Sequence, residues 1–360
     1  MGLCTAFALR AQGARVRVVD AVAAPNPQAS SVDHHRLIRH SYGAQHGYMR
    51  MVDDAYLAWS RIFAALGEAP YVETGVLALD EGVGTWLPES RAAMRAHGLA
   101  VEDLPAPALP ARFPWMSDAR VVDAFFCARG GVLLARRIVE LLAARIAPSI
   151  ARVREVHDGA VTLEDGTRLS ADMIVVAAGP WAPRLLPGIA PRVTASRQII
   201  VRLAPPPALA EAWARAPMLL DLSELGGFYM VPPVAGTPIK IGDHSFSRQG
   251  DANDPREASA AEAEAILGLA RHRIPGLEHY TPLGAMACYY DVEPREEFVV
   301  DMLSPRSIVM SGFSGHGFKF GSVLGQAVAN AIINPALRAA LPDWAAGRIP
   351  PPPGLLESAA

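Results

Sequence analysis

Three glycines, a histidine and a lysine fall within the eight residues GFSGHGFK near the carboxyl end of this 360-residue chain. Gly312, Gly315 and Gly317 allow the backbone to come close to a flat or charged group. The loop follows an apolar, strand-like run and precedes a stretch with helical spacing, whose N-terminal amides face the same place. A structural junction and a ligand-binding loop explain this pattern equally well. His316 and Lys319 are the candidate chemical groups of the loop.

A second group of chemically capable residues is the segment DHHRLIRHSYG at positions 33–43, which contains Arg36 and Arg39. Its three histidines invite a metal site, but no carboxylate or cysteine geometry supports one, and we predict no metal. A solvent-exposed basic loop is the ordinary alternative.

Lys240, Gly242 and His244 alternate in an apolar run typical of a strand. In a strand these three positions share one face, and Gly242 leaves space between the lysine and the histidine. A surface lysine on an edge strand is the alternative interpretation. Tyr229 and Tyr290, judged alone, are more typical of a hydrophobic core.

The N-terminal residues have the pattern of a nucleotide-binding unit that lacks its beginning. Residues 2–13 are helical up to a glycine, and residues 14–20 form an apolar strand that ends at Asp20. In a complete unit, a strand and Gly-x-Gly-x-x-Gly precede this helix, and an acid about 20 residues later binds a ribose hydroxyl. Gly2 would then be the last glycine, and Asp20 the ribose acid. Either the reading frame begins upstream, or the phosphate-binding loop is shortened.

Gly179 and Trp181 follow another apolar run, 172–178, which predicts a buried strand that ends in a glycine turn. Such a turn often lies beside a bound dinucleotide. Any parallel strand can end in this way, so the turn alone has little specificity.

Composition limits the classes of protein to which the chain can belong. About half of the residues are apolar, and the formal net charge of −3 argues against nucleic acid as the main partner. The longest apolar runs are far below the ~18 residues that indicate a membrane span. Cys4, Cys127 and Cys288 are widely spaced and match no disulfide or metal framework. We therefore predict a reduced, cytoplasmic monomer with no membrane or nucleic-acid partner.

Taken together, GFSGHGFK at 312–319, RLIRHSYG at 36–43 and KIGDH at 240–244 resemble motifs of the sarcosine oxidase and N-methyltryptophan oxidase family. This family is part of the D-amino-acid oxidase superfamily. The spacing from Cys288 to residues 298–301 agrees with the family without a gap. The chain departs from the family pattern at Val32, His35 and Leu220, and it has one extra residue before Cys288. The similarity extends over most of the chain.

The resemblance implies a role for each candidate residue. Arg36 would lie against the face of the flavin, and Arg39 and Lys319 would bind the carboxylate of the substrate, since a guanidinium fork pairs with both carboxylate oxygens. Lys240 would assist oxygen reduction, with His244 beside it in the pocket. Tyr229, Tyr290 and Cys288 would line the cavity, with Cys288 bonded covalently to the flavin. The cofactor-binding set is Gly2, Asp20, Arg36, Gly179, Trp181, Cys288, Gly312, Gly315, His316, Gly317 and Lys319.

The fold class that we predict is mixed α/β, with a discontinuous Rossmann-like FAD-binding domain whose first strand is missing. Residues 1–71, 134–195 and 283–345 would form this domain. Residues 72–133 and 196–282 would form a substrate domain with a mixed sheet, and residues 346–360 a disordered tail.

The resemblance implies an FAD-dependent amine oxidase. Its substrate would be a small secondary amino acid, such as an N-methyl or cyclic imino acid, and O₂ would be reduced to H₂O₂. One alternative is a dehydrogenase of the same fold that passes electrons to a quinone or carrier. Another is a shortened, non-catalytic remnant that binds FAD poorly. We favour an upstream start over this remnant, because every downstream motif is intact in kind.

Overall fold

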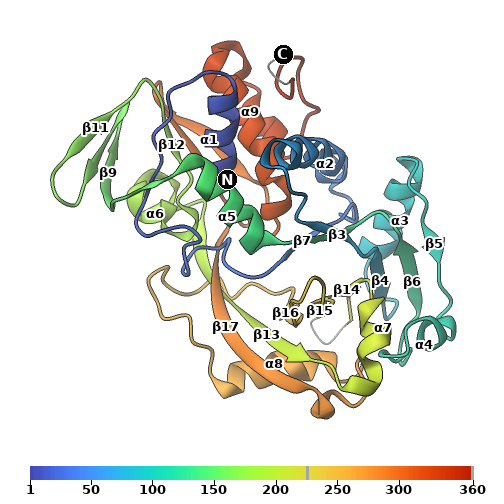
Figure 1. The fold of residues 1–360 in the computed structure, drawn as a ribbon. Coiled ribbons are helices and arrows are strands. Elements are labelled where there is room, and N and C mark those ends of the chain that lie inside the picture. Colours follow the sequence, from blue (N-terminus) through green and yellow to red (C-terminus); the bar gives the residue numbers. More distant parts are fainter. Residues whose placement is uncertain (224–226, 358–360) are drawn as a thin grey trace.

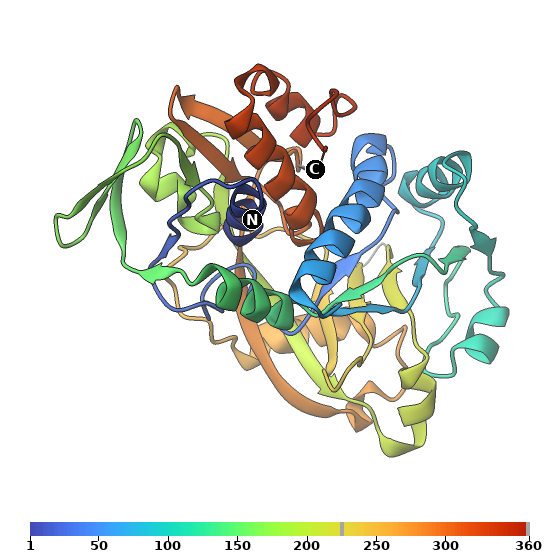
Figure 2. The ribbon, with the colours of Figure 1, turned by 45° about the horizontal axis from the view of Figure 1, so that its top comes forward.

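The computed structural model describes residues 1–223 and 227–357 and shows a mixed α/β fold (Figure 1). Four helices gather on one side of the molecule, and a long curved sheet forms the other side, as the two views in Figures 1 and 2 show. The predicted fold class is confirmed. These helices are α1 (Gly2–Ala11), α2 (His46–Leu66), α5 (Ala135–Ile146) and α9 (Gly321–Ile333).

The large sheet has eight strands, assembled from segments that lie far apart in the chain. Their order is β17 (Thr281–Val292), β13 (Thr194–Ala204), β16 (Ile239–Asp243), β15 (Phe228–Val231), β14 (Met218–Asp221), β4 (Val76–Asp80), β6 (Asp123–Cys127) and β5 (Glu102–Asp103). Strand β14 is parallel to β4, and the other neighbouring pairs are antiparallel.

Alternation along β16 gives the sheet two different faces. Ile239 and Ile241 are fully buried in a hydrophobic core that also contains Ile266 of α8 (Ala260–Ala270). Lys240 and Gly242 alternate with them in sequence, so they point to the opposite face. The apolar side of this strand is therefore fixed by the core, and Lys240 is turned away from it.

In the helical half, α1 packs directly on α9. Gly325 of α9 permits this approach, because a Cβ atom at this position would lie 2.7 Å from the backbone carbon of Cys4. The carboxyl end of α1 leads into β1 (Val19–Asp20), which pairs in parallel with β8 (Ser149–Ile150).

A separate sheet has the order β12 (Ile174–Val176), β19 (Ser307–Ser311), β18 (Val299–Ser304). Within the described residues, no ladder joins β1 to β12, and Val19, Ile174 and Val175 are only half-buried. Parallel strands are normally covered on both faces. The nucleotide-type unit is thus represented by its helix and its second strand.

Shorter elements connect these parts. The remaining strands are β2 (Arg36–Ile38), β3 (Tyr71–Glu73), β7 (Gly131–Leu133), β9 (Val153–His157), β10 (Ala160–Leu163) and β11 (Arg168–Ser170). The remaining helices are α3 (Trp86–Ala96), α4 (Ala108–Arg112), α6 (Ala182–Leu185), α7 (Ala210–Ala214) and α10 (Leu341–Ala345). Short 3₁₀ turns are η1 (Gly179–Trp181), η2 (Pro187–Ile189), η3 (Pro207–Leu209), η4 (Leu277–His279), η5 (Phe318–Phe320) and η6 (Pro335–Leu337).

The C-terminal segment differs from the disordered tail predicted for residues 346–360. Asn330 of α9 donates hydrogen bonds to the carbonyl oxygens of Leu355 and Glu357, both at 2.8 Å, and Leu355 is fully buried. Gln326 of α9 also donates to the carbonyl oxygen of Leu356 at 2.6 Å, so a few side chains hold an irregular, proline-rich stretch that has no periodic pattern in its sequence. Residues 358–360 lie outside the described part of the chain.

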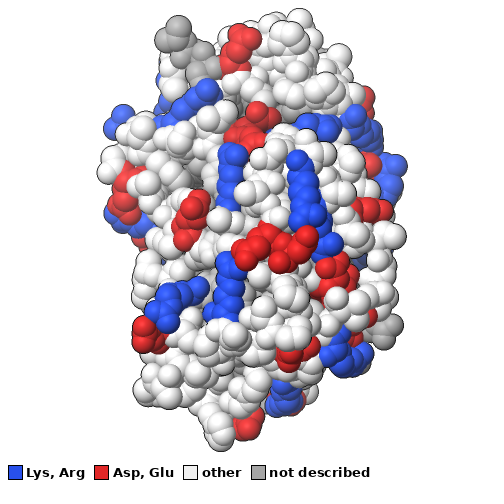
Figure 3. Space-filling view, turned by 90° about the vertical axis from the view of Figure 1, so that its right-hand side faces the viewer, with Lys and Arg blue, Asp and Glu red and all other residues white. Residues whose placement is uncertain are grey.

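No helix in the described residues is both long and apolar enough to cross a membrane. On the face shown in Figure 3, acidic and basic side chains are interspersed, and neither sign forms a continuous patch.

Candidate functional site

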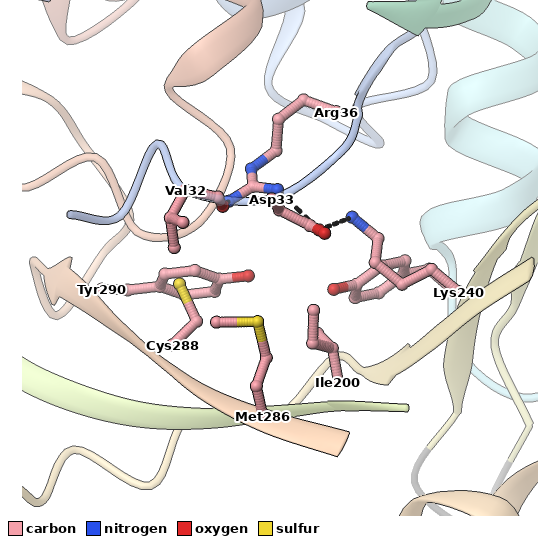
Figure 4. Close-up of a pocket in the computed structure, with 9 residues that line it drawn as sticks. Val32, Asp33, Arg36, Ile200, Lys240, Met286, Cys288 and Tyr290 are labelled. Atoms are coloured by element: carbon pink, nitrogen blue, oxygen red, sulfur yellow. Dashed lines mark hydrogen bonds and ion pairs between the residues drawn. The ribbon is translucent and has the colours of Figure 1, made fainter. Parts of the chain in front are cut away.

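A small buried cavity lies between the large sheet and the segment that precedes β2 (Figure 4). Its volume is about 10 Å³, which is room for about one water molecule. Figure 4 shows its walls as two opposed layers, with Arg36 and Asp33 on one side and Tyr290, Cys288 and Met286 on the other. The lining residues are Val32, Asp33, Arg36, Ile200, Tyr229, Lys240, Met286, Cys288 and Tyr290.

Lys240 enters this cavity as one member of a buried ion-pair cluster. Its Nζ atom lies 2.7 Å from an oxygen of Asp33 and donates a second hydrogen bond, 3.0 Å long, to the carbonyl oxygen of His35. Burial lowers the pKa of Lys240 to about 8, although Asp33 opposes this effect. Burial raises the pKa of Asp33, but Lys240 and Arg36 outweigh it and hold that pKa well below its ordinary value. Asp33 therefore offsets part of the positive charge of this cluster, which remains net positive.

Arg36 is held rigidly on one wall of the cavity. Its guanidinium donates to the carbonyl oxygens of Ser30 and Val32, both at 2.6 Å, and to Asp33 at 2.9 Å. Burial lowers the pKa of Arg36, yet Asp33 raises it above the ordinary value, so the guanidinium is always charged. It presents a fixed, planar, positive surface to the cavity.

The opposite wall is formed by side chains of β15 and β17. Tyr229 and Tyr290 are half-buried, and desolvation raises the pKa of Tyr290 to about 12, which keeps its hydroxyl protonated. The sulfur of Cys288 also lines the cavity and lies 3.9 Å from the carbonyl oxygen of Ser30. Burial raises the pKa of the Cys288 thiol, although Arg36 lowers it in part.

Half-buried Arg39 and buried Lys319 form a second cluster of cations around the ring of Tyr42. The Cζ atom of Arg39 lies 4.9 Å from the centre of this ring, and the Nζ atom of Lys319 lies 5.3 Å from it. Lys319 donates hydrogen bonds to the Tyr42 hydroxyl at 2.9 Å and to the carbonyl oxygen of His316 at 3.1 Å. Arg39 donates to the carbonyl oxygen of Ser41.

Neither cation of this second cluster makes an ion pair with an acid of the described residues. Burial lowers the pKa of Arg39, and burial together with Arg39 holds the pKa of Lys319 well below its ordinary value. A buried and a half-buried positive group that lack a carboxylate partner are electrostatically costly. The arrangement is that of a site for an anion.

Two histidines border this site in different ways. His316 uses both ring nitrogens within the protein, one on the Tyr42 hydroxyl at 3.3 Å and the other on the carbonyl oxygen of Glu296 at 3.2 Å. The ring of His244 is tilted against that of Tyr229, with the ring centres 6.0 Å apart, and its buried Nε2 atom has no hydrogen-bond partner within the described residues. Burial lowers the pKa of His244 to about 4, and Arg39 contributes to this effect, so the ring is neutral at neutral pH.

The glycine loop connects the two clusters. Gly312 and Gly315 have φ values of 70° and 73°, which favour glycine. A Cβ atom at Gly315 would lie 2.6 Å from the ring of Tyr290, and one at Gly317 would lie 2.6 Å from Phe313. The loop thus packs tightly against the wall of the first cavity and delivers Lys319 to the second cluster.

Four predicted cofactor residues lie outside both clusters. Gly2 begins α1 beside Ala177, at the end of β12. Asp20 ends β1 and accepts long hydrogen bonds from the Val22 amide at 3.5 Å and the Asn26 side chain at 3.4 Å. Gly179 follows β12, with φ of 52°. The indole of Trp181 donates to Asn253 at 2.7 Å.

Two residues of the site were absent from the predictions. Asp33, which pairs with Lys240, and Tyr42, which lies between Arg39 and Lys319, have no pattern around them that marks their roles. The sequence did contain one signal for the lysines. Of the 33 lysines and arginines of the chain, only Lys240 and Lys319 are lysine. Both are buried at these two clusters, whereas arginine serves every other position.

The fold is mixed α/β with a nucleotide-type helix and strand, and the site holds two cations, Arg39 and Lys319, without an acid partner among the described residues. The family model of the FAD dependent oxidoreductases (DAO) matches residues 1–331, and the chain belongs to this family. An N-methyl-L-tryptophan oxidase of Yersinia pestis (strain Pestoides F) is 27% identical over 332 residues, which are 88% of each chain.

Solved structures share the fold. The L-proline dehydrogenase from P. horikoshii superposes with a TM-score of 0.81 at 17% identity, over 96% of this chain and 94% of the other. NikD, described as an unusual amino acid oxidase essential for nikkomycin biosynthesis, superposes with a TM-score of 0.78 at 20% identity, over 93% and 91% of the two chains.

FAD is therefore the cofactor, and the chemical types of the residues at the site suit its flavin ring, ribose and phosphates. Arg36 and Tyr290 provide opposed planar walls, which suit a flat ring, although the walls must separate to admit it. Arg202 has a buried Nε atom without a partner among the described residues. In the N-terminal nucleotide-type unit, Asp20 can accept further hydrogen bonds, as binding of a ribose hydroxyl requires. Helix α1 has no acid in its first turn that would repel a phosphate at its N-terminus.

Proposed function

We propose that this chain uses FAD to oxidise the C–N bond of a small secondary amino acid to an imine, with O₂ reduced to H₂O₂. The observation that carries this proposal is the pair of cations, half-buried Arg39 and buried Lys319, which make no ion pair with an acid of the described residues. A substrate carboxylate supplies the missing negative charge. N-methyl amino acids and cyclic imino acids satisfy this requirement. Two similar proteins are named for N-methyl-L-tryptophan and L-proline, both secondary amines.

Each residue of the site has a task in this reaction. Arg39 and Lys319 bind the carboxylate and fix the orientation of the substrate. The entropy of ordering the reactants is then lost on binding and adds little to the activation free energy of the chemical step. The free Nε2 atom of neutral His244 accepts a hydrogen bond from the amine. When bound, FAD accepts a hydride from the carbon beside the amine. Tyr229 and Tyr290 exclude water from the reacting atoms.

The cofactor contacts follow the predicted set. Arg36 supports the flavin ring, and the amides of Gly312, Gly315 and Gly317 approach it. Gly2, Asp20, Gly179 and Trp181 lie toward the nucleotide. We further propose a covalent bond from Cys288 to the flavin, since its sulfur lines the cavity. If acid precipitation of the purified protein leaves all yellow colour in the supernatant, this bond does not exist.

The proposal is tested by the requirement for the carboxylate. The purified protein is mixed anaerobically with N-methyl and cyclic amino acids, and loss of the flavin absorbance is followed. Matched amides and decarboxylated amines serve as controls. We expect the second-order rate constant for flavin reduction to be at least about 100-fold larger with the amino acids than with the amides and amines. The controls lack the carboxylate and therefore its two charge-assisted contacts. Equal rates for acids and controls would contradict the proposal.

A second candidate is a dehydrogenase that passes electrons to a quinone or carrier protein. The fold shared with the L-proline dehydrogenase from P. horikoshii, at a TM-score of 0.81, supports this alternative. Fast reduction of an artificial dye with slow peroxide formation would establish this alternative.

A further inference from the structure

Asp33 is the least expected charged residue of the site. Its side chain is only 2% exposed, and it is surrounded by three cations. One carboxylate oxygen lies 2.7 Å from Lys240 and 2.9 Å from Arg36, and the other lies 3.0 Å from Arg202 of β13. One acid therefore forms ion pairs with cations that come from three separate elements.

The backbone at Asp33 is strained. Its φ of 128° lies in a region that residues with a Cβ atom rarely adopt. A conformation of this kind persists only where the surrounding contacts require it, and such residues cluster at functional sites. Here the three ion pairs of the side chain hold the backbone in place. The strain shows that the carboxylate is kept at this position against the local preference of the chain.

The two lysines of the chain allow the effect of this carboxylate to be compared directly. Lys240 and Lys319 are buried to a similar degree, with 2% and 4% of their surface exposed. Each lies close to an arginine, but only Lys240 has an acid beside it among the described residues. Burial lowers the pKa of both lysines, and Asp33 opposes this effect at Lys240 alone.

We propose that Asp33 is a positioning residue that keeps Lys240 protonated in its buried, arginine-rich surroundings, and so keeps an ammonium group in the cavity for the oxidative half of the reaction. This inference rests on the proposed function for its catalytic consequence. In that half-reaction O₂ takes two electrons and one proton from the reduced cofactor, and a second proton from solvent, to give H₂O₂. The first electron creates negative charge, which an adjacent ammonium stabilises.

The surroundings of Lys240 contain no other acid among the described residues that could do this. The carbonyl oxygen of His35 accepts a hydrogen bond from it but carries no charge. The titratable or charged side chains that face Lys240 come from the segment before β2, from β2 and from β13, β15 and β17. They are Asp33, His35, Arg36, Arg202, Tyr229 and Cys288.

The test uses the fact that the chain has only two lysines. The protein is prepared with ¹³C-labelled lysine, and the Cε signals are followed by NMR as the pH is raised. Lys240→Arg and Lys319→Arg assign the two signals. In Asp33→Asn and Asp33→Gly we expect the titration midpoint of Lys240 to fall by about one pH unit or more, while the midpoint of Lys319 stays where it is. Asp33→Gly removes the same charge and also relieves the positive φ, so we expect this variant to be more stable than Asp33→Asn.

An unchanged Lys240 midpoint in Asp33→Gly would overturn the proposal. A matched control is Asp301→Asn, which removes an acid at the protein surface and should move neither midpoint. Because this measurement needs no substrate, its result does not depend on whether the chain oxidises amines.

A second measurement links the charge to the reaction. The rate constant for reaction of the reduced enzyme with O₂ is measured from mildly acidic to alkaline pH. We expect it to fall as the pH rises through the Lys240 midpoint, and the whole profile to move to lower pH in Asp33→Gly by the same interval as the NMR midpoint. At a pH above both midpoints, the variant should react about tenfold more slowly for each pH unit by which the midpoint has fallen. Superimposable profiles would show that Asp33 does not act through Lys240.

Discussion

Lys240 and Lys319 are equally buried but differ in what surrounds them. Lys240 is carried by a central strand of the large sheet, where Asp33 lies 2.7 Å away. Lys319 follows the glycine loop and lies near Arg39, with only neutral oxygens as hydrogen-bond acceptors among the described residues. The protein supplies the anion for one ammonium and leaves the other without one.

This difference separates the two half-reactions of the proposed chemistry. The cluster of Lys240 contains an acid, so its ammonium stays charged whether or not a ligand is present. A step with an uncharged molecule such as O₂ requires such a group. An uncompensated cluster recovers the cost of burial only when an anion binds. The fold therefore discriminates between the two lysines by the placement of a single carboxylate, and the following changes test that difference.

The largest expected effect is on stability. Asp33→Asn leaves Lys240 and Arg36 buried without their acid, and loss of one partner of a buried ion pair costs about 3–5 kcal/mol. Lys319→Met removes an ammonium that has no acid, so we expect its free energy of unfolding to stay within about 1 kcal/mol of the unaltered protein. Urea unfolding of the ligand-free proteins gives both values. Equal losses in the two variants would remove the distinction between the clusters.

Lys240→Met should slow the reaction of the reduced enzyme with O₂ by about 10²–10³-fold, because the positive group that stabilises the developing charge is lost. Stopped-flow spectroscopy measures the reductive and oxidative halves separately. Lys240→Arg keeps the positive charge but changes the shape of the side chain. Its rate constant for reaction with O₂ should fall by less than that of Lys240→Met. If Lys240→Met slows both halves by the same factor, Lys240 has no special role with O₂.

Arg39→Leu should weaken binding of a carboxylate ligand by about 100-fold, the loss of charge-assisted hydrogen bonds from one guanidinium. Titration of the flavin spectrum with an unreactive aromatic carboxylate gives the dissociation constant. Arg39→Lys retains the positive charge without the planar guanidinium fork. Its dissociation constant should lie between those of the unaltered protein and Arg39→Leu. An unchanged constant in Arg39→Leu would place the substrate carboxylate elsewhere.

Binding at the second cluster should also depend on pH. Burial and Arg39 hold the pKa of Lys319 well below that of a free lysine, and a bound carboxylate raises it again. Ligand binding therefore takes up as much as one proton, and affinity declines as the pH rises through the pKa of the free protein. Calorimetry in buffers with different ionisation enthalpies counts the protons. Proton release on binding would contradict this assignment.

Much of this arrangement could be predicted from local patterns. The alternation around Lys240 specifies a strand, and burial of Ile239 and Ile241 on the far face turns the lysine toward the cavity. The glycines of the 311–320 segment predict a close backbone approach, which the contact between Gly315 and the ring of Tyr290 confirms.

The partner of Lys240 could not be predicted in this way. Asp33 and Lys240 are 207 residues apart, and a pairing over this separation depends on how the segments pack. The positive φ of Asp33 is equally invisible in the sequence, because aspartate has no preference for φ near 128°. The role of Tyr42 is hidden for a similar reason, since it arises only where Arg39 and Lys319 meet.

The smallest expected effect tests whether the two regions are mechanically connected. In Gly315→Ala, the new Cβ atom would lie 2.6 Å from the ring of Tyr290, and φ of 73° is unfavourable for alanine. We expect a loss of about 1–2 kcal/mol in stability, because Tyr290 must move. If the loop connects the clusters, displacement of this ring also changes the flavin spectrum and weakens carboxylate binding a few-fold. Gly166→Ala has similarly unfavourable φ in a turn with open space around it, so it controls for backbone strain alone. Equal effects of the two substitutions on ligand binding would show that Gly315 does not transmit a change from one cluster to the other.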